Sequence, residues 1–332
     1  MKRSLFLLGM AAAALSSCTN EDVVDVAQNR AIRFDTFVNN NTRAVTEVTT
    51  ENLSSYYLFG KYGDATGNYS VLVFDNEPSS TIAYWTANKY YAFGAYANGN
   101  GNGNRIDNAT FDANAGKLKF PSYTPDDEKD LVAATARAEA GSDVTNKEAV
   151  SLQFAHMLSQ VKFTFKTDVA DSYIIKISNL QFNAVKTADG SYTKTTEAAG
   201  TIDWTENASN GDYTYKVMSD IADKNKNYTD SDVKLVIPQG NTDKISVTFT
   251  ATLSGPGIDG EVNKEFTTGL GYEAGSISGT EANTWTHGYR YNYTATINAD
   301  QIKDDLTKIE FTTEVTQWED ANDTTVKPSE KP

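Results

Sequence analysis

The stretch VSLQFAHMLSQVKFTF, Val150–Phe165, indicates the fold class most directly. In its second half Val161, Phe163 and Phe165 alternate with lysine and threonine. A β-strand turns every second side chain to one face, so this alternation predicts a half-buried strand. Short runs of the same kind, bounded by Gly, Asn, Asp or Pro, recur at Tyr56–Tyr62, Tyr69–Phe74, Tyr90–Tyr96, Tyr173–Phe182, Val233–Ile237, Ile245–Leu253, Tyr289–Ile297 and Ile309–Trp318. Their number and spacing predict an all-β protein built from β-sandwiches.

Two segments carry local signals of their own. Asp127–Ala140, DEKDLVAATARAEA, has high helix propensity, but Leu131–Ala134 fits a buried strand equally well. The sequence leaves helix and strand open there. In TADGSYT, Thr187–Thr193, the Asp189-Gly190 pair predicts the turn of a β-hairpin.

Length and charge limit the organisation and the partners. A chain of 332 residues exceeds one typical hydrophobic core, so we expect two domains, 44–150 and 151–318, and a polar tail, 319–332. The formal net charge of -15, with no basic stripe, argues against nucleic acid as a partner.

The sequence contains no signature of catalysis. His156 lies between Phe154 and Met157, where a packed or hydrogen-bonded structural role is expected, and His287 precedes Gly288 in a predicted turn. Neither histidine has a partner at metal-ligand spacing. We therefore expect no enzymatic activity, no metal and no cofactor, although a carboxylate pair brought together by folding would still permit a hydrolase.

The N-terminus predicts export and lipid attachment. Residues 1–17 combine a basic start with the apolar run Leu5–Leu15, which is too short to cross a bilayer. The following Cys18, the only cysteine, stands in a Leu-Ser-Ser-Cys sequence that resembles the bacterial lipobox. Glu21 and Asp22 resemble the signal that sends lipoproteins of Bacteroides-type bacteria to the outer face of the outer membrane. We expect a surface-exposed outer-membrane lipoprotein.

A strand and an exposed arginine follow the predicted anchor. In AIRFDTFV, Ala31–Val38, one face carries Ile32, Phe34 and Val38, which predicts a half-buried strand. The next residues, NNNTRA, have no packing pattern, so Arg43 is expected in an exposed loop of the kind that proteases cut.

Several of these segments together resemble one family. DLVAATA followed by VSLQFAHMLSQVKFTF, the lipobox start, NTRA and the late WTHGYRYNYTATI occur in the order seen in the fimbrillin-like proteins, the type V pilins of Bacteroides-type bacteria. The resemblance covers most of the chain. It implies two tandem transthyretin-like β-sandwich domains after a lipoprotein signal peptide.

The resemblance also implies an assembly mechanism. An arginine-specific protease would cut between Arg43 and Ala44 and remove the leader 18–43 with its strand. Arg30 and Arg33 are poorer candidates, inside or beside that strand. An extended segment of another fimbrial subunit would then fill the vacated groove. The partners implied are other fimbrial subunits, the outer membrane before cleavage, the protease, and a host or bacterial surface ligand.

The donor segment is left open by the sequence. Ile309, Phe311 and Val315 alternate and suit either a donated strand or a resident final strand. The alternative function is a surface lipoprotein that never polymerises and binds glycans through exposed aromatics. Four tryptophans are its candidates, although tryptophans of a sandwich usually belong to the core: Trp85, Trp204, Trp285 and Trp318.

Overall fold

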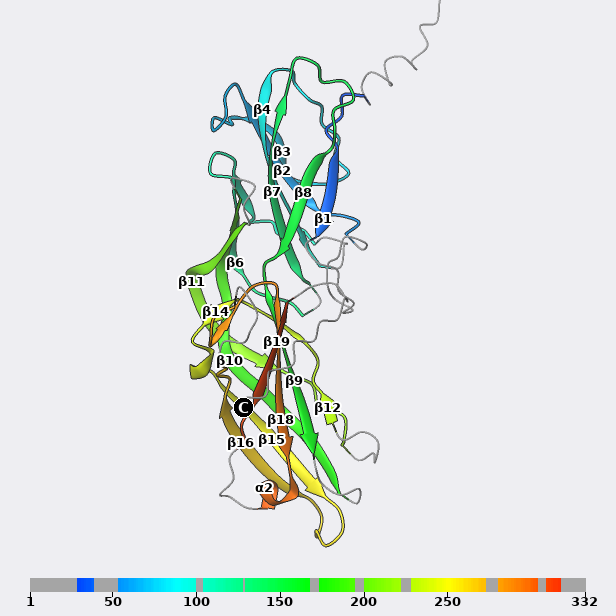
Figure 1. Cartoon of the computed structure of the whole chain (residues 1–332), viewed down its shortest axis with the longest axis vertical. Helices are drawn as coiled ribbons and strands as arrows, with labels where there is room; N and C mark the ends of the chain where they lie inside the picture. The colour runs from blue at the N-terminus through cyan, green and yellow to red at the C-terminus, as the bar shows by residue number, and fades with distance from the viewer. Residues whose placement is uncertain are drawn as a thin grey trace, which may run out of the picture.

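The regular secondary structure of the described residues is almost entirely β-strand, as predicted. The computed structural model describes residues 29–38, 53–99, 104–127, 129–167, 173–194, 200–221, 228–272, 280–303 and 309–317. The sheet that contains β1 lies at one end of the long axis of the molecule, and the other sheets lie toward the opposite end (Figure 1). The elements are β1 (Phe34–Val38), β2 (Tyr57–Gly63), β3 (Val71–Pro78), β4 (Lys89–Asn98), β5 (Thr110–Asp112), β6 (Lys117–Tyr123), β7 (Leu131–Ala140), β8 (Val150–His156), β9 (Ser159–Thr167), β10 (Ile174–Thr193), β11 (Thr201–Thr214), β12 (Tyr228–Asp230), β13 (Lys234–Val236), β14 (Gln239–Gly240), η1 (Thr242–Lys244), β15 (Ser246–Ser254), β16 (Val262–Gly269), β17 (Thr284–Trp285), β18 (Tyr289–Ile297), α2 (Ala299–Lys303) and β19 (Thr312–Gln317).

The first sheet has the strand order β1-β8-β7-β4-β2-β3. Neighbouring strands are antiparallel except β1 and β8, which are parallel. Both faces of the central strand β4 are buried: Phe93 packs into one hydrophobic core and Tyr96 into another. The sheet is therefore covered on both sides, and β1 forms one of its edges.

Two further sheets pack face to face. One has the order β16-β15-β10-β6-β5 with β11 beside β10, and the other has the order β12-β9-β18-β19 with β13 beside β9. Phe163, Phe249 and Tyr293 come from both sheets and meet in the core between them. This arrangement confirms the predicted β-sandwich class. The pair β14–β17 forms a small separate sheet.

A middle core joins the first sheet to the rest of the molecule. Phe59 and Tyr96 of the first sheet pack in one cluster with Leu118 of β6 and Trp204 of β11. The indole N–H of Trp204 donates a hydrogen bond of 2.8 Å to the carbonyl of Met157, where the chain passes from β8 to β9. The division of the chain at residue 150 remains a prediction.

The segment for which the sequence did not distinguish helix from strand forms β7. It lies in the middle of the first sheet between β8 and β4. Ala133 contributes to the middle core and Ala134 to the core on the other face of the sheet, and both are fully buried. Alanines at these positions allow close packing on both faces, and this tertiary requirement overrides their helix propensity.

The predicted hairpin at Asp189-Gly190 is wrong. Both residues lie inside β10, which runs without a turn and pairs with β11 and β6 there. The register with β11 shifts on both sides of Asp189. A Cβ atom on Gly190 would lie closer than 3.0 Å to three ring carbons of the buried Trp204. The glycine therefore admits an indole ring to the middle core instead of forming a turn.

One local arrangement occurs twice, in front of β4 and in front of β18. The main-chain N–H of Thr86 donates to the hydroxyl of Tyr91 at 2.7 Å, and that of Thr286 donates to Tyr291 at 2.7 Å. Each threonine follows a fully buried tryptophan. A Trp-Thr turn fastened by a tyrosine five residues later thus begins a central strand in each half.

Replacing Gly190 with alanine tests the close approach of Trp204. Because Trp204 is buried and hydrogen-bonded, the added methyl group forces the core apart, and Gly190→Ala should lower the free energy of unfolding by about 1–3 kcal/mol. Urea denaturation measures this. The control is Gly240→Ala, where the nearest atom lies 3.8 Å from the added Cβ, and we expect a change below about 0.5 kcal/mol. Equal effects of the two substitutions would contradict this account.

Candidate assembly site

The first strand occupies an edge of the first sheet and is hydrogen-bonded along β8. The register sets Phe34 opposite Val150 and Val38 opposite Phe154. Figure 1 shows β1 in blue running beside β8 in green. The N-terminal strand is thus paired with a strand more than a hundred residues later in the chain, and its loss would leave the edge of β8 open.

The other edge of β1 is paired only near its start. The N–H of Ile32 donates to the carbonyl of Ala83 at 2.8 Å, and the N–H of Trp85 donates to the carbonyl of Arg30 at 3.0 Å. This neighbouring segment follows β3, the opposite edge strand of the sheet. The residues just before β1 therefore pair with the segment after β3, while β1 itself pairs with β8.

Beyond this point the two segments separate. The Arg33 carbonyl accepts a hydrogen bond of 2.8 Å from β8, and main-chain groups alternate in direction along a strand, so those of Phe34 and Thr36 face away from β8. The facing segment turns away, with the N–H of Thr81 donating to the carbonyl of Pro78. Within the described part of the chain, no residue hydrogen-bonds to Phe34 or Thr36 on this edge.

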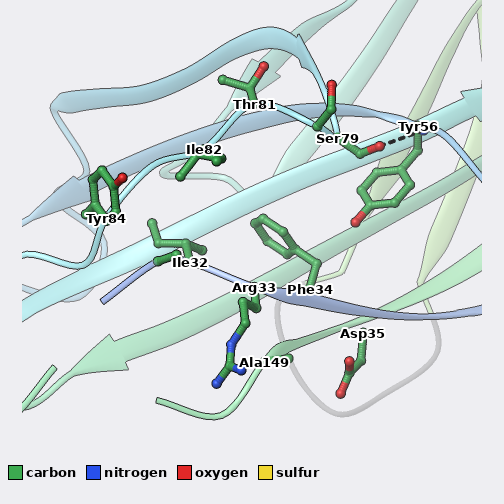
Figure 2. A pocket seen from close by; sticks show the side chains of 12 residues that line it. Ile32, Arg33, Phe34, Asp35, Tyr56, Ser79, Thr81, Ile82, Tyr84 and Ala149 are labelled. Carbon is green, nitrogen blue, oxygen red and sulfur yellow. Dashed lines mark hydrogen bonds between the residues drawn. The ribbon is translucent and has the colours of Figure 1, made fainter. Parts of the chain in front are cut away.

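The gap forms an open groove with a volume of about 700 Å³. Its most exposed apolar side chains are Ile82, 70% exposed, and Tyr84, 49% exposed. Figure 2 shows Ile32, just before β1, and Phe34 in β1 pointing toward the side of Ile82 and Tyr84, whereas Arg33 and Asp35 point to the other side. The groove is lined by Ala31, Ile32, Arg33, Phe34, Asp35, Tyr56, Ser79, Ser80, Thr81, Ile82, Tyr84 and Ala149.

Tyr56, immediately before β2, borders the groove. Its main-chain N–H donates to the Ser79 hydroxyl at 3.4 Å, and its ring packs on Phe154 with ring centroids 5.7 Å apart. Burial, and secondarily the negative charge of Asp35, raise the pKa of Tyr56 to about 12. The side chain is therefore a neutral, mostly apolar part of the groove wall at physiological pH.

The apolar face of β1 is packed into the core of the first sheet. Ile32 and Val38 are 7% and 5% exposed. The half-buried Phe34 ring lies edge-on to Phe93, with centroids 5.2 Å apart, and to Phe74 at 6.1 Å. Phe37 points the other way and is half exposed. The structure thus places the three predicted residues on the inner face; whether the strand is removed remains a prediction.

Arg30 and Arg33 are both held by main-chain and side-chain hydrogen bonds. The carbonyls of Arg30 and Arg33 both accept main-chain hydrogen bonds within the sheet. Their side chains also donate to main-chain carbonyls, Arg30 to Trp85 at 3.3 Å and Arg33 to Lys147 at 2.8 Å. Cys18, Arg43 and Ala44 lie outside the described residues, as do Trp318 and the tail 319–332.

The final strand is resident in this structure. β19 pairs with β18 on one side and forms the edge of its sheet. Ile309 is buried, and Phe311 packs against Phe163 and Phe165 with centroids 5.4 and 5.9 Å apart. Val315 is only partly buried.

The first and last strands share a sequence pattern that we did not predict. Ala31–Val38 and Ile309–Gln317 both contain Ile-x-Phe-x-Thr-x-Val, which begins before β1 and before β19 and continues into each strand, so the same four residues recur at the same alternate positions. These residues are Ile32, Phe34, Thr36 and Val38 in the first segment, and Ile309, Phe311, Thr313 and Val315 in the last. Aligning the two segments directly would have revealed the pattern before the structure was known.

The remaining candidate residues from the sequence are the two histidines and the tryptophans. His156 is buried, as predicted, and its Nδ1 lies 2.8 Å from Oδ2 of Asp130. Burial lowers the pKa of the nearby His287. The three described tryptophans are all core residues: Trp85, Trp204 and Trp285. Within the described ranges, no group of His, Cys, Asp or Glu is placed to hold a metal ion, and no helix is long and apolar enough to cross a membrane.

Comparison with known proteins gives one family and one shared fold. The family model described as fimbrillin-like matches residues 30–318. A fimbrial protein from Bacteroides vulgatus has the same fold, with a TM-score of 0.56, 15% identity, and coverage of 87% of this chain and 100% of that chain. No curated protein is significantly similar to the chain in sequence.

More distant structures are also similar. A structure described as a putative cell adhesion protein from Bacteroides uniformis matches with a TM-score of 0.40, 18% identity, and coverage of 87% of this chain and 97% of that chain. The fimbrial anchor protein Mfa2 from Porphyromonas gingivalis matches with a TM-score of 0.34, 12% identity, and coverage of 85% and 96%.

The packing of β1 is tested by truncating its two phenylalanines. Phe34→Ala removes the ring that contacts Phe74 and Phe93, and it should lower the free energy of unfolding by roughly 2 kcal/mol, less than for a fully buried ring. Phe37→Ala, on the exposed face of the same strand, should change it by less than about 0.5 kcal/mol. Denaturant titration of the intact chain distinguishes them, and a larger loss for Phe37→Ala would show that the face assignment is wrong.

Proposed function

The chain belongs to the fimbrillin-like family, and we propose that it is a structural or accessory subunit of a fimbrium that assembles when a protease releases its first strand. A fimbrial role at the cell surface, among other fimbrial subunits, follows from the family. The proposal adds the trigger, the strand that is lost and the strand that replaces it. Adhesion through the finished fimbrium is the expected outcome.

The shared Ile-x-Phe-x-Thr-x-Val pattern carries this proposal. A strand that replaces β1 must present the same side chains at the same alternate positions, because one face meets a preformed core. The segment Ile309–Val315 of a second copy meets this requirement at all four positions. Phe311 would take the place of Phe34 against Phe74 and Phe93.

The last described strand is suited to leave its sheet. Among the described strands β19 comes last in the sequence and pairs with β18 alone, so in this proposal it separates from its sheet by breaking one pairing. Val315 is partly buried where it is, whereas Val38 is 5% exposed in the β1 position. Moving to that position therefore buries more of the valine side chain, whereas Ile309 is already as buried as Ile32, and the added burial favours exchange at about 25 cal/mol per Å².

Cleavage at Arg43 supplies the trigger in this proposal. The peptide bonds after Arg30 and Arg33 are held within the sheet, and a protease must take its substrate out of such hydrogen bonds before cutting. Cutting after Arg43 converts the leader from a covalent part of the chain into a separate peptide. Lipid attachment at Cys18 would hold the uncut subunit at the outer membrane, and release of the leader would free it.

The alternative, a glycan-binding lipoprotein that does not polymerise, loses its best candidates. Binding through tryptophans requires exposed indole faces, and the three described tryptophans are buried in the cores. We therefore propose a non-enzymatic assembly protein in preference to a glycan-binding one.

Arg43→Ala tests the trigger. We expect an arginine-specific protease to remove the leader from the unmodified chain, after which heat-resistant ladders appear on a denaturing gel. Arg43→Ala should keep the leader and form no ladder, because the first strand stays covalently attached. N-terminal sequencing of surface material identifies the cut. Arg33→Ala is the control and should be cut and polymerise normally. Normal ladders from Arg43→Ala would overturn the proposed trigger.

Paired cysteines test the register of the exchange. If Phe311 takes the place of Phe34, then Thr312 takes the place of Asp35, which lies opposite Ser151 on β8. A chain carrying Thr312→Cys and Ser151→Cys should form disulfides between subunits, because neighbouring strands bring Cα atoms within disulfide range. A non-reducing gel of the cut protein should show covalent polymers. Within one subunit Thr312 pairs with Thr294 instead.

The control places the second cysteine two residues further along β8. Gln153 lies opposite Phe37, so Thr312→Cys with Gln153→Cys should give few covalent polymers while the heat-resistant ladder remains. Equal crosslinking by both pairs would mean that no fixed register exists. Because Cys18 leaves with the leader, it does not interfere.

A further inference from the structure

We propose that the open groove beside β1 is a docking site where the replacing strand of a second copy binds while β1 is still in place. This inference rests on the proposed strand exchange and adds how the exchange begins. The groove is present with β1 bound, so it is available before any apolar surface of the core is uncovered.

The main chain of β1 determines what kind of ligand the groove suits. Phe34 and Thr36 each direct an N–H and a C=O to the edge of β1 that faces away from β8, two residues apart along the strand, and the groove lies along this edge as far as Asp35. Groups at this spacing are matched by another extended backbone, because strands pair through every second residue. The segment after β3 fills this role only as far as Ile32, and then turns away.

The side chains of the groove suit a strand with one apolar and one polar face. Ile82, Tyr84 and the Tyr56 ring supply apolar surface, while Ser79 and Thr81 supply hydroxyls. Apolar side chains as exposed as Ile82 gain from being covered. In Ile309–Val315 the isoleucine, phenylalanine and valine alternate with threonine and glutamate, so this segment of a second copy has the required two faces.

Docking beside β1 predicts an associative exchange. The incoming strand is held next to the position that it will take, and it moves in as β1 peels away from β8. The core is then never exposed to water. In a dissociative exchange, by contrast, β1 leaves first and the rate depends only on its own departure.

The kinetics of leader release distinguish these two routes. The thiol of Cys18, the only cysteine, can carry a fluorophore on a chain that starts there, and cutting after Arg43 leaves the labelled leader bound. The probe added is a synthetic peptide of Ile309–Gln317, IEFTTEVTQ. Fluorescence anisotropy follows release. We expect the release rate to rise in proportion to peptide concentration, and a scrambled peptide to leave it unchanged.

Substitution at the mouth of the groove tests its location. Ile82→Glu places a charge where the peptide's apolar face would dock, and it should slow peptide-driven release about tenfold. Because Ile82 is largely exposed, the fold should persist. Leu72→Glu is the matched control: Leu72 on β3 is 55% exposed, lies outside the groove, and should exchange at the normal rate.

The outcomes separate the docking site from the exchange itself. A release rate independent of peptide concentration, or equal rates for Ile82→Glu and the unmodified chain, would overturn the docking site and leave strand exchange standing. Equal release by the scrambled peptide would also overturn it, since the groove would then accept any apolar ligand. If the peptide never replaces the leader, both the docking site and the proposed exchange fail.

Discussion

Main-chain hydrogen bonding at the edge of the first sheet is the constraint on which the proposed function depends. Strand β8 has β7 on one side and requires a partner on the other, and β1 provides it. β1 also inserts Phe34 into the aromatic core formed with Phe74 and Phe93. An unfilled edge above an open core is both costly and prone to bind another strand. Filling that edge, by one strand or another, is therefore a condition of stability.

The sheet that contains β1 and the sheet that contains β19 share two structural features. Each has a central strand introduced by a Trp-Thr turn that a tyrosine hydroxyl fastens. Each also has an edge strand whose Ile-x-Phe-x-Thr-x-Val pattern places a phenylalanine among other aromatic rings. A segment that fits the edge of one sheet is therefore also suited to the edge of the other. In the proposed exchange, this likeness would let one sequence supply both the strand that is lost and the strand that replaces it.

The sequence predicted the strands well because alternation records which face is buried. It was ambiguous at β7 and wrong at Gly190, where packing on both faces of a sheet and the approach of Trp204 decided the outcome. The repeated pattern was readable in the sequence and was missed. The parallel pairing of β1 with β8 and the groove beside Phe34 were not readable, because they depend on which distant strands become neighbours and on where the segment after Pro78 turns away.

The direction of β1 has a mechanical consequence for a subunit that is still tethered. A tether at Cys18, as proposed, would pull on the start of β1, while the body of the molecule continues from the end of β8 at His156. In a parallel pair these two points lie at opposite ends. Tension between tether and body therefore slides the strands along each other, and their hydrogen bonds carry the load together instead of opening one after another. The paired strands therefore resist separation by a pulling force, whereas cutting the chain after β1 requires no force.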